Sequence, residues 1–372
     1  MPPATRNAFR YLCWCLSRAL VSSRACTDLP AGQSEWEGLL RLSGEHLVVP
    51  QLRWALREQG LWAALPAEVA DYLDAVYTLN LERNCGCEEQ LRELVTRLNG
   101  IGVVPVLLKG AAALIDGLYP TAGERMMSDL DVLVPANRLP EALHALAAVG
   151  YRPTVDAGER LPDPVGYDKV VHHYPALISS DWSCRVELHV HPVHLPFAGL
   201  LPSDEVFADG RQPDWRGGCC ALPSETHFLM HNLIHSFLNN TLLRLQRVSL
   251  RQLFEFVLAS QRYGGTIDWP KLHERFARHG YENECRRYLA LAQECLDFAP
   301  QYAGEPAIDS RDRNANAWEI FRLEADSRGL EWTLNAAAQI RARLERVRRE
   351  PGRIRMLTKA RFYSNFFRSL GR

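Results

Sequence analysis

Two aspartates two positions apart, Asp129 and Asp131, stand at the start of an apolar segment that reads DLDVLV. A β-strand has a side-chain period of two, so both carboxylates are expected on one face of the strand. The alternating residues Leu130 and Val132 then point to a core. Two like charges side by side are unfavourable unless a cation lies between them. The pair therefore predicts a site for a hard divalent cation, with Mg²⁺ the default and Mn²⁺ the alternative.

The residues that precede the aspartates have types suited to a phosphate. An apolar strand ends at Lys109, Gly110 and Ala111, and a helix follows. A glycine lets backbone N–H groups approach a phosphate closely, and the start of a helix favours an anion. Arg125 and Ser128 come just before the aspartates, where a guanidinium can meet a phosphate through two N–H groups. Lys109, Gly110, Arg125 and Ser128 are predicted to bind a nucleotide, although Lys109 could also lie exposed at a strand end and Ser128 could cap the loop.

A third carboxylate, Glu187, lies on a later alternating strand, CRVELHVHPV at 184–193. The period of two places it on the same face as His189. Three carboxylates can hold two Mg²⁺ ions, one activating the attacking oxygen and the other stabilising a leaving pyrophosphate. Glu187 could also serve as general base towards an acceptor hydroxyl. We expect His189 to line the cleft and to orient a carboxylate or the acceptor.

The elements that must position these residues form an α+β fold. Helical periodicity dominates before residue 100 and after Ser224, with one long helix predicted from Pro66 to Asn99 and an N-cap at Ser34 with Glu37 in capping-box position. Strands are predicted around Asp129, at 170–178 and at 184–193. We predict a small mixed β-sheet core that carries the site, flanked by helical regions and divided as 1–99 (N-terminal helices), 100–222 (core), 223–330 (C-terminal helices) and 331–372 (basic tail).

The composition excludes some classes of protein. Lys plus Arg number 43 against 44 for Asp plus Glu, so net charge predicts no general affinity for nucleic acid or membrane. The ten cysteines include no C-x-x-C pair, and no secretory signal or spanning apolar run is evident, so a cytoplasmic protein with reduced thiols is predicted. The basic tail is read either as a solvated end or as a surface for an anionic partner.

The histidines offer a rival interpretation. His189, His191 and His194 could bind zinc in a zinc-dependent hydrolase. His231 and His235 lie one helical turn apart, but no glutamate follows His231, so the metalloprotease pattern H-E-x-x-H is absent. The simpler interpretation of that pair is packing of a helix against the catalytic sheet.

Several segments together resemble the bacterial nucleotidyltransferases of the polymerase-β-like superfamily, a group often found near polysaccharide and peptide-modification genes. The segments in and around the predicted core are LLKGAAAL (107–114), LYP (118–120), RMMSDLDVLV (125–134), VGY (149–151) and VELHVHPV (186–193). The segments outside it are WEGLLRLSGEHLVVPQL (36–52), LERNCG (81–86), HNLIHSF (231–237) and IDWPKL (267–272). The resemblance covers roughly residues 30–290, and its most specific part is 107–134.

In that superfamily a Gly-Ser or Gly-Gly turn holds the triphosphate, and acids on two strands bind the metals. By this resemblance Gly110 and Ala111 form the turn, Asp129 and Asp131 are the first acids, and Glu187 is the third. Ala111 has no hydroxyl, so only its backbone can serve the phosphate, and the third acid is Glu rather than Asp.

The predicted function is Mg²⁺-dependent transfer of a nucleoside monophosphate from an NTP, such as ATP, to a hydroxyl or phosphate acceptor in a biosynthetic or modification pathway. A sugar, a peptide or another small molecule is favoured over nucleic acid as acceptor. The alternative from another class is a non-catalytic nucleotide- or partner-binding protein on the same fold.

Overall fold

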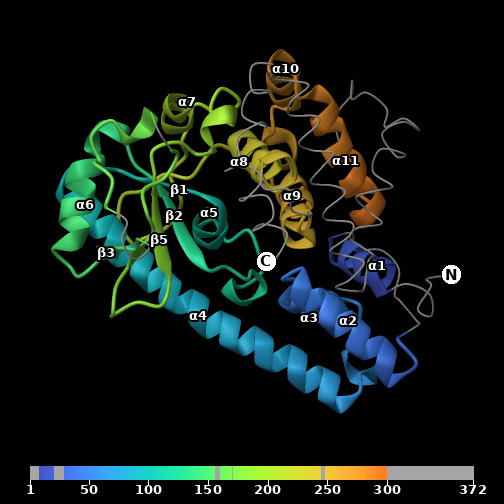
Figure 1. The fold of residues 1–372 in the computed structure, drawn as a ribbon. Helices are drawn as coiled ribbons and strands as arrows, with labels where there is room; N and C mark the ends of the chain where they lie inside the picture. Colours follow the sequence, from blue (N-terminus) through green and yellow to red (C-terminus); the bar gives the residue numbers. More distant parts are fainter. Residues whose placement is uncertain (1–7, 21–28, 156–159, 170, 244–247, 300–372) are drawn as a thin grey trace, which may run out of the picture.

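The computed structural model describes five stretches of the chain (Figure 1), residues 8–20, 29–155, 160–169, 171–243 and 248–299. Within these stretches, helices surround one mixed sheet of five short strands, so the predicted α+β class is confirmed. The strands are β1 (Val106–Leu107), β2 (Asp129–Leu133), β3 (Arg152–Pro153), β4 (Leu177–Ile178) and β5 (Arg185–His189).

The helices fall into three groups along the chain. The first group is α1 (Ala8–Leu20), α2 (Gln33–Glu45), α3 (Val49–Glu58) and α4 (Ala67–Gly100). The second lies among the strands and consists of α5 (Lys109–Ile115), α6 (Leu139–Ala147) and α7 (Ser203–Ala208). The third is α8 (Glu225–Leu233), which continues as the π-helical segment η6 (Ile234–Leu243), then α9 (Leu250–Tyr263), α10 (Trp269–Arg278) and α11 (Glu282–Leu296).

The sheet has the strand order β1-β2-β5-β4-β3, and its central pair is parallel. β1 runs antiparallel to β2, and β4 runs antiparallel to both β5 and β3. Along β2 the apolar residues Leu130 and Val132 are fully buried, as the period of two predicts. The two aspartates of β2 therefore share the other face.

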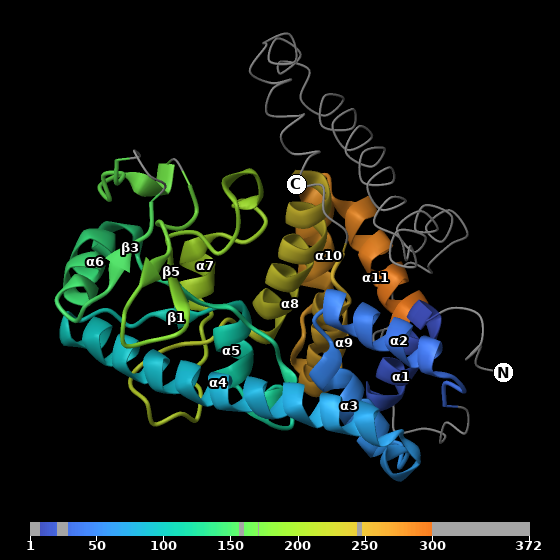
Figure 2. The same cartoon turned by 60° about the horizontal axis from the view of Figure 1, so that its bottom comes forward.

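α4 is the longest element in the described part of the chain, and it agrees with the prediction of one helix from Pro66 to Asn99 to within a residue at each end. Its C-terminal half packs against α5 and α6 beside the sheet, while its N-terminal half packs against α3. Figure 2 shows α4 passing along both the sheet and the bundle of helices formed by the two ends of the chain. Parts distant in sequence meet in that bundle, where α1 contacts α9 and α11.

Two local predictions are wrong. α2 begins at Gln33 after Gly32, with no side-chain cap, so Ser34 lies inside the helix rather than at its N-cap. The strand expected over 170–178 is reduced to β4 and an isolated bridge between His173 and His189. By contrast, the helix expected after Ser224 is present as α8, and Ser224 caps it, because its hydroxyl accepts a hydrogen bond from the backbone N–H of His227.

One disulfide contradicts the expectation of reduced thiols. It joins Cys87 of α4 to Cys184, the residue before β5, with the two Cα atoms 6.3 Å apart. Cys85, Cys219, Cys220 and Cys295 are free thiols. The bond ties the long helix to the strand that carries Glu187.

The predicted division of the chain at residues 99, 222 and 330 stays a prediction. The basic tail, 331–372, and the end of the third predicted region beyond residue 299 lie outside the described residues.

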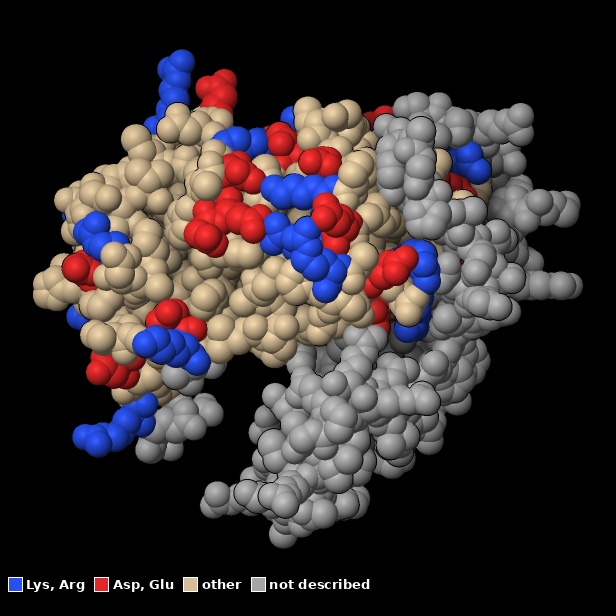
Figure 3. Space-filling model, turned by 90° about the horizontal axis from the view of Figure 1, so that it is seen from above, with Lys and Arg blue, Asp and Glu red and all other residues tan. Residues whose placement is uncertain are grey.

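The described surface over α7 and α10 mixes charges of both signs. Figure 3 shows acidic and basic side chains side by side on this face rather than gathered by sign. Arg275 pairs with Glu205 at 2.7 Å, and Lys271 pairs with Asp209 at 3.0 Å, so each pair joins α10 to α7 or to the residue after it. Among the helices that the structure describes, none has the length and apolar character needed to cross a membrane.

Candidate active site

The parallel register of β2 and β5 sets the site. Asp131 is the direct partner of Glu187 in this register, and Leu133 is the partner of His189. Oxygen atoms of the two carboxylates and a ring nitrogen of His189 all lie within 4.8 Å of one another. Two acids 56 residues apart in the chain therefore meet only when the sheet has formed, and the predicted Asp131–Glu187 association is present.

Asp131 is a buried acid of the site that is hydrogen-bonded to two side chains. It is 2% exposed, and its Oδ1 accepts a hydrogen bond from Nζ of Lys109 at 2.7 Å. The same oxygen lies 2.8 Å from Nε2 of His189. Burial alone would raise the pKa of Asp131, but the charge of Lys109 and the hydrogen bond to His189 outweigh burial and hold that pKa well below its usual range. Asp131 is therefore an anion held between two donors.

Lys109 reaches Asp131 from a strained backbone. Its φ of 46° lies in the left-handed region, which lysine rarely adopts. Burial would lower the pKa of Lys109, but the charge and hydrogen bond of Asp131 raise it, so the ammonium stays charged. The structure thus places Lys109 on a carboxylate of the site rather than exposed at a strand end.

Gly110 follows in a position that has no room for a side chain. A Cβ atom there would lie within 3.0 Å of Cζ of Arg125 and 3.3 Å of Cβ of Met127. The close approach of Arg125 thus requires glycine at this turn, while Ala111 after it is fully buried in the core.

Asp129 shares the face of Asp131 but lies outside the closest group of ligand atoms. Its Oδ1 accepts a hydrogen bond from the hydroxyl of Ser128 at 3.3 Å. Burial and the negative charge of Asp131 raise the pKa of Asp129, and Lys109 only partly offsets them. A carboxylate whose charged form is disfavoured by its neighbours is one that a bound cation would stabilise.

His189 presents a defined nitrogen to the acids. Its Nδ1 lies 3.2 Å from the carbonyl oxygen of His191, which can only accept a hydrogen bond, so Nδ1 carries a proton. Nε2 donates to Oδ1 of Asp131 and lies 3.6 Å from Glu187. Burial would lower the pKa of His189, but the hydrogen bonds to these acids raise it. A ring whose other nitrogen is held by a backbone carbonyl is the usual arrangement in a metal-binding histidine, and a cation at Nε2 would take the place of the proton there. The mixed oxygen and nitrogen donor set of Asp131, Glu187 and His189 therefore fits a divalent cation.

Arg125 is paired with an acid from the third group of helices. Its Nη2 donates to Oε1 of Glu255 at 3.2 Å, and its Nε contacts Oε2 of the same carboxylate. Both side chains are almost fully buried, at 8% and 4% exposure. Burial would lower the pKa of Arg125, but Glu255 raises it above its ordinary value. The predicted phosphate contact of Arg125 must therefore use the part of the guanidinium that lies over Gly110.

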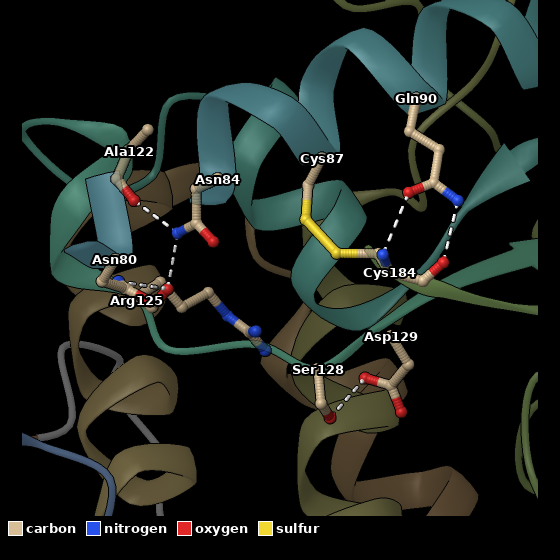
Figure 4. Close-up of a disulfide and its surroundings, with 9 residues drawn as sticks. All are labelled: Asn80, Asn84, Cys87, Gln90, Ala122, Arg125, Ser128, Asp129 and Cys184. Atoms are coloured by element: carbon tan, nitrogen blue, oxygen red, sulfur yellow. Dashed lines mark hydrogen bonds between the residues drawn. A yellow bond between two sulfur atoms is a disulfide. The ribbon is translucent and has the colours of Figure 1, made fainter. Parts of the chain in front are cut away.

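Two asparagines of α4 hold the loop that carries Arg125. The amide of Asn80 donates to the carbonyl oxygens of Gly123 and Arg125 at 2.7 and 3.0 Å. The amide of Asn84 donates to those of Ala122 and Arg125 at 2.6 and 2.7 Å. Figure 4 shows both asparagines side by side on α4, pointing to this loop. Buried polar networks of this kind fix a backbone in one arrangement.

The next turns of α4 hold the strand that carries Glu187. Gln90 donates to the carbonyl oxygen of Cys184 at 2.8 Å and accepts from its backbone N–H at 3.3 Å. The disulfide from Cys87 reaches the same residue, as Figure 4 shows. One face of α4 therefore positions both the loop before β2 and the start of β5.

A cavity of about 230 Å³ opens beside these residues. One wall comes from the catalytic unit and includes Lys109, Gly110, Arg125, Ser128, Asp129 and Asp131. The opposite wall comes from α8, the start of η6 and α9, and includes His231, Asn232, His235, Arg251, Gln252 and Glu255. The site thus lies between the sheet and the third group of helices.

A comparison with known families decides between the candidate chemistries. Residues 32–297, more than half of the chain, match the family model described as an uncharacterised nucleotidyltransferase, NTP_transf_5. The chain belongs to this nucleotidyltransferase family. No curated protein matches it.

Family membership identifies a transferase enzyme with an NTP substrate, from a family that generally uses a divalent metal. The matched range includes both walls of the cavity, so α8 and α9 belong to the nucleotidyltransferase unit as much as the sheet does. The resemblance to nucleotidyltransferases seen in the sequence is thus confirmed.

The zinc interpretation of the histidines is wrong for the described residues. The one group with metal-binding geometry there is Asp131, Glu187 and His189. His191 points elsewhere, with Nε2 at 3.0 Å from the carbonyl oxygen of Asp168. The ring of His194 lies against that of His172, with the ring centroids 3.6 Å apart and the planes tilted by 38°. β5 ends at His189, so the side chains of His191 and His194 no longer follow the alternation of the strand and do not share the face of His189.

His231 is a residue of this nucleotidyltransferase that sequence reasoning took for simple packing. It is 3% exposed, lines the cavity, and its Nε2 has no hydrogen-bond partner among the described residues. Burial and the charge of Lys109 lower its pKa to about 3, so the ring is neutral. The backbone of Pro192 hydrogen-bonds the ring, and because Pro192 offers only a carbonyl oxygen, Nδ1 donates and Nε2 is left as an acceptor. His231 therefore presents a lone pair to the cavity.

Proposed function

We propose that this protein is a metal-dependent nucleotidyltransferase of the polymerase-β-like superfamily that moves a nucleoside monophosphate from an NTP to a small acceptor. The observation that carries the proposal is the register pairing of Asp131 with Glu187 beside His189, at a cavity whose lining includes Asp129 and Asp131. Acids placed together in this way can hold the divalent cations that support nucleotidyl transfer, a reaction that depends on positioning and on charge stabilisation.

In the proposed reaction the acceptor oxygen bonds to the α-phosphorus of the NTP, and the bond from that phosphorus to the bridging oxygen breaks, releasing pyrophosphate. Asp129, Asp131 and Glu187 would hold two Mg²⁺ ions, or Mn²⁺, with His189 beside them. Bound metal would activate the attacking oxygen and stabilise the leaving group. Glu187, the more accessible partner of Asp131, is our candidate to receive the proton of the acceptor hydroxyl.

The nucleotide residues take distinct roles in this proposal. Gly110 and Ala111 provide the backbone against which the triphosphate lies. Lys109 and Arg125 are anchored to Asp131 and Glu255, and so orient the acids and the turn while they face the cavity. Ser128 holds Asp129 and reaches the same cavity. A cavity of about 230 Å³ favours a sugar, a peptide end or another small molecule over nucleic acid as acceptor.

Three further points belong to the proposal. We place the protein in the cytoplasm of a bacterial cell, in a biosynthetic or modification pathway. ATP is the first NTP to test. The basic tail, 331–372, would offer a surface to an anionic partner.

The test replaces Asp131 by Asn, which keeps the shape and removes the charge. We expect Asp131→Asn to lower metal-dependent pyrophosphate release by at least about a hundredfold. The substitution removes an acidic ligand for the metal, and it also disturbs Lys109 and His189, which both bind Asp131. Pyrophosphate release is measured with each of the four NTPs and a panel of acceptors, in Mg²⁺ and in Mn²⁺. Asp71→Asn, at an exposed position of α4, is the matched control. Full activity of Asp131→Asn would show the assignment to be wrong.

The ion pair between Lys109 and Asp131 favours one alternative, a nucleotide-binding protein without turnover. A lysine on the carboxylate occupies an oxygen that a metal would use. Calorimetry with Mg·NTP separates the two functions, because the binding protein would take up nucleotide tightly and release no pyrophosphate with any acceptor or metal.

A further inference from the structure

Some of the cationic side chains that line the cavity have no carboxylate partner within the part of the chain that the structure describes. Four cationic side chains face it, from Arg83, Lys109, Arg125 and Arg251. Lys109 is matched by Asp131 and Arg125 by Glu255. Across the described residues, neither Arg83 nor Arg251 forms an ion pair or a hydrogen bond. Two guanidinium groups therefore remain for a ligand.

Arg251 is the more constrained of the two. It lies in the first turn of α9, and its Nε atom is buried without a hydrogen-bond partner in the described structure. Glu255, one helical turn later, already binds Arg125. Burial and the charge of Arg125 lower the pKa of Arg251, which shows how unfavourable its position is without an anion. A partly buried cation with no partner costs stability and is usually kept for a reason.

Arg83 comes from a different part of the wall. It lies on α4, next to Asn84, which holds the loop carrying Arg125, and it is half-buried at the cavity. The two arginines thus belong to elements that the fold already uses to build the site, α4 on one side and α9 on the other. A guanidinium presents N–H groups in a fixed fork that matches two oxygens of a phosphate.

A second observation also indicates a polar ligand in this cavity. Nε2 of His231 is a buried acceptor with no partner in the described residues, on the wall adjacent to Arg251. Arginine donors and a histidine acceptor in one cavity suit a ligand that carries both phosphate oxygens and a hydroxyl or amino group, as a nucleotide does.

We propose that Arg83 and Arg251 form the anion subsite of the cavity and bind the phosphate chain of the substrate, which is the triphosphate of the NTP. This inference rests on the proposed function. It also differs from the sequence-based prediction, which assigned the triphosphate to Lys109 and Arg125, because those two cations already have carboxylate partners.

The experiment measures binding by calorimetry for three probes, namely Mg·ATP, AMP and inorganic tripolyphosphate. The variants are Arg251→Met, Arg251→Lys and Arg83→Met in the full chain. Arg262→Met on α9 and Arg97→Met on α4 are matched controls, because both arginines are exposed outside the cavity on the same two helices.

We expect Arg251→Met and Arg83→Met each to weaken the binding of Mg·ATP and tripolyphosphate by about tenfold to a hundredfold, the range given by charge-assisted hydrogen bonds. The binding of AMP should change much less. The affinity of Arg251→Lys for Mg·ATP and tripolyphosphate should fall between those of the wild type and Arg251→Met. Arg251→Met should also melt at a higher temperature than the wild type, because it removes a partly buried, unpaired charge. If Arg251 had only a structural role, Arg251→Met would melt at a lower temperature than the wild type.

Two results would contradict the assignment of the anion subsite to Arg83 and Arg251. One is unchanged tripolyphosphate and Mg·ATP binding in Arg251→Met and Arg83→Met. The other is an equal loss for AMP and Mg·ATP, which would place the arginines on another part of the nucleotide or on the acceptor. Tripolyphosphate binding that depends on Arg251, without any nucleotide binding or pyrophosphate release, would leave the anion subsite in place and reject the proposed function alone.

Discussion

At the scale of single residues, three charged or titratable side chains of the site are each held by a named partner. Lys109 holds Asp131, Glu255 holds Arg125, and a backbone carbonyl orients His189. Preorganised groups of this kind stabilise charge in a transition state without having to move. The packing that keeps them in place is therefore as sensitive to substitution as the charges themselves, and Gly110 is the position where this is most evident.

Gly110→Ala tests that packing. The added methyl would overlap the guanidinium of Arg125, which cannot yield because Glu255 holds it. Overpacking of this kind costs about 1–3 kcal/mol, so we expect kcat/KM for the NTP to fall by about tenfold or more. Pyrophosphate release and thermal melting measure the two effects.

Gly86→Ala is the control for Gly110→Ala. Gly86 lies within α4 and a Cβ there meets no atom within 4 Å, so alanine should keep activity and stabilise the helix by up to about 1 kcal/mol. Equal activity of Gly110→Ala and Gly86→Ala would contradict the close approach of Arg125 to the turn.

At the scale of elements, α4 aligns the two catalytic strands. Asn80 and Asn84 bind the loop before β2, and Gln90 and Cys87 bind the residue before β5. The four residues recur at helical spacing along one face, so a rigid helix fixes the relative position of the loop and the strand. The sheet itself is small, and this helix supplies the rigidity that two-residue strands lack.

The disulfide between Cys87 and Cys184 tests the role of α4. It closes a loop of 97 residues, and loss of such a bond typically costs about 2–4 kcal/mol. We expect the double variant Cys87→Ser with Cys184→Ser to unfold at lower urea concentration than the wild type. Reducing agent should lower the wild-type midpoint to a similar degree and leave the double variant unchanged.

Cys85→Ser, at an exposed free thiol of the same helix, is the control and should behave as the wild type. A wild-type midpoint that does not respond to reducing agent would show that this bond contributes nothing to stability in solution.

Local patterns explain which parts of the site could be predicted. The period of two along β2 and β5 identified Asp129, Asp131 and Glu187, because strand alternation is set by nearest neighbours. Glu255, His231 and Arg251 were missed, since their place in the cavity depends on how α8 and α9 pack against the sheet. Helical periodicity shows that a face is buried but not what it is buried against.

The same limit applies to the fold. The long helix and the α+β class follow from patterns that extend over many residues. The strand expected at 170–178 shrank to β4 because only Leu177 and Ile178 pair with neighbouring strands as a ladder, while His173 makes an isolated bridge to His189. The disulfide could not be predicted either, because ten cysteines without diagnostic spacing allow many pairings.

At the scale of the whole molecule, the cavity exists only while the sheet and the third group of helices stay together. Asp116, at the end of α5, connects them. Its carboxylate accepts hydrogen bonds from Arg211 at 2.7 and 2.6 Å and from the hydroxyl of Tyr263, the last residue of α9, at 2.6 Å. The side chain of Asp116 is only 14% exposed. This cluster lies away from the acids of the site, so its effect on stability can be separated from catalysis.

The pH dependence of stability should reveal this connection. Burial alone would raise the pKa of Asp116, but hydrogen bonds from Arg211 and Tyr263 outweigh burial and lower that pKa below the ordinary value of an aspartate. A carboxyl whose folded-state pKa is depressed stabilises the protein above its unfolded pKa, and that contribution is lost as pH falls through the folded pKa. We therefore expect Asp116→Asn to lower the free energy of unfolding by about 1–3 kcal/mol at neutral pH.

Urea unfolding of the wild type and of Asp116→Asn at several pH values measures the difference. It should be constant from about pH 7 to about pH 5 and shrink below about pH 4, where the wild-type carboxyl takes up a proton. Asp71→Asn should show no such difference, since Asp71 is exposed on α4. If the difference for Asp116→Asn instead persists unchanged well below pH 4, the ionised carboxylate is not what holds α5 to α9, and the shape of the residue alone would account for the loss.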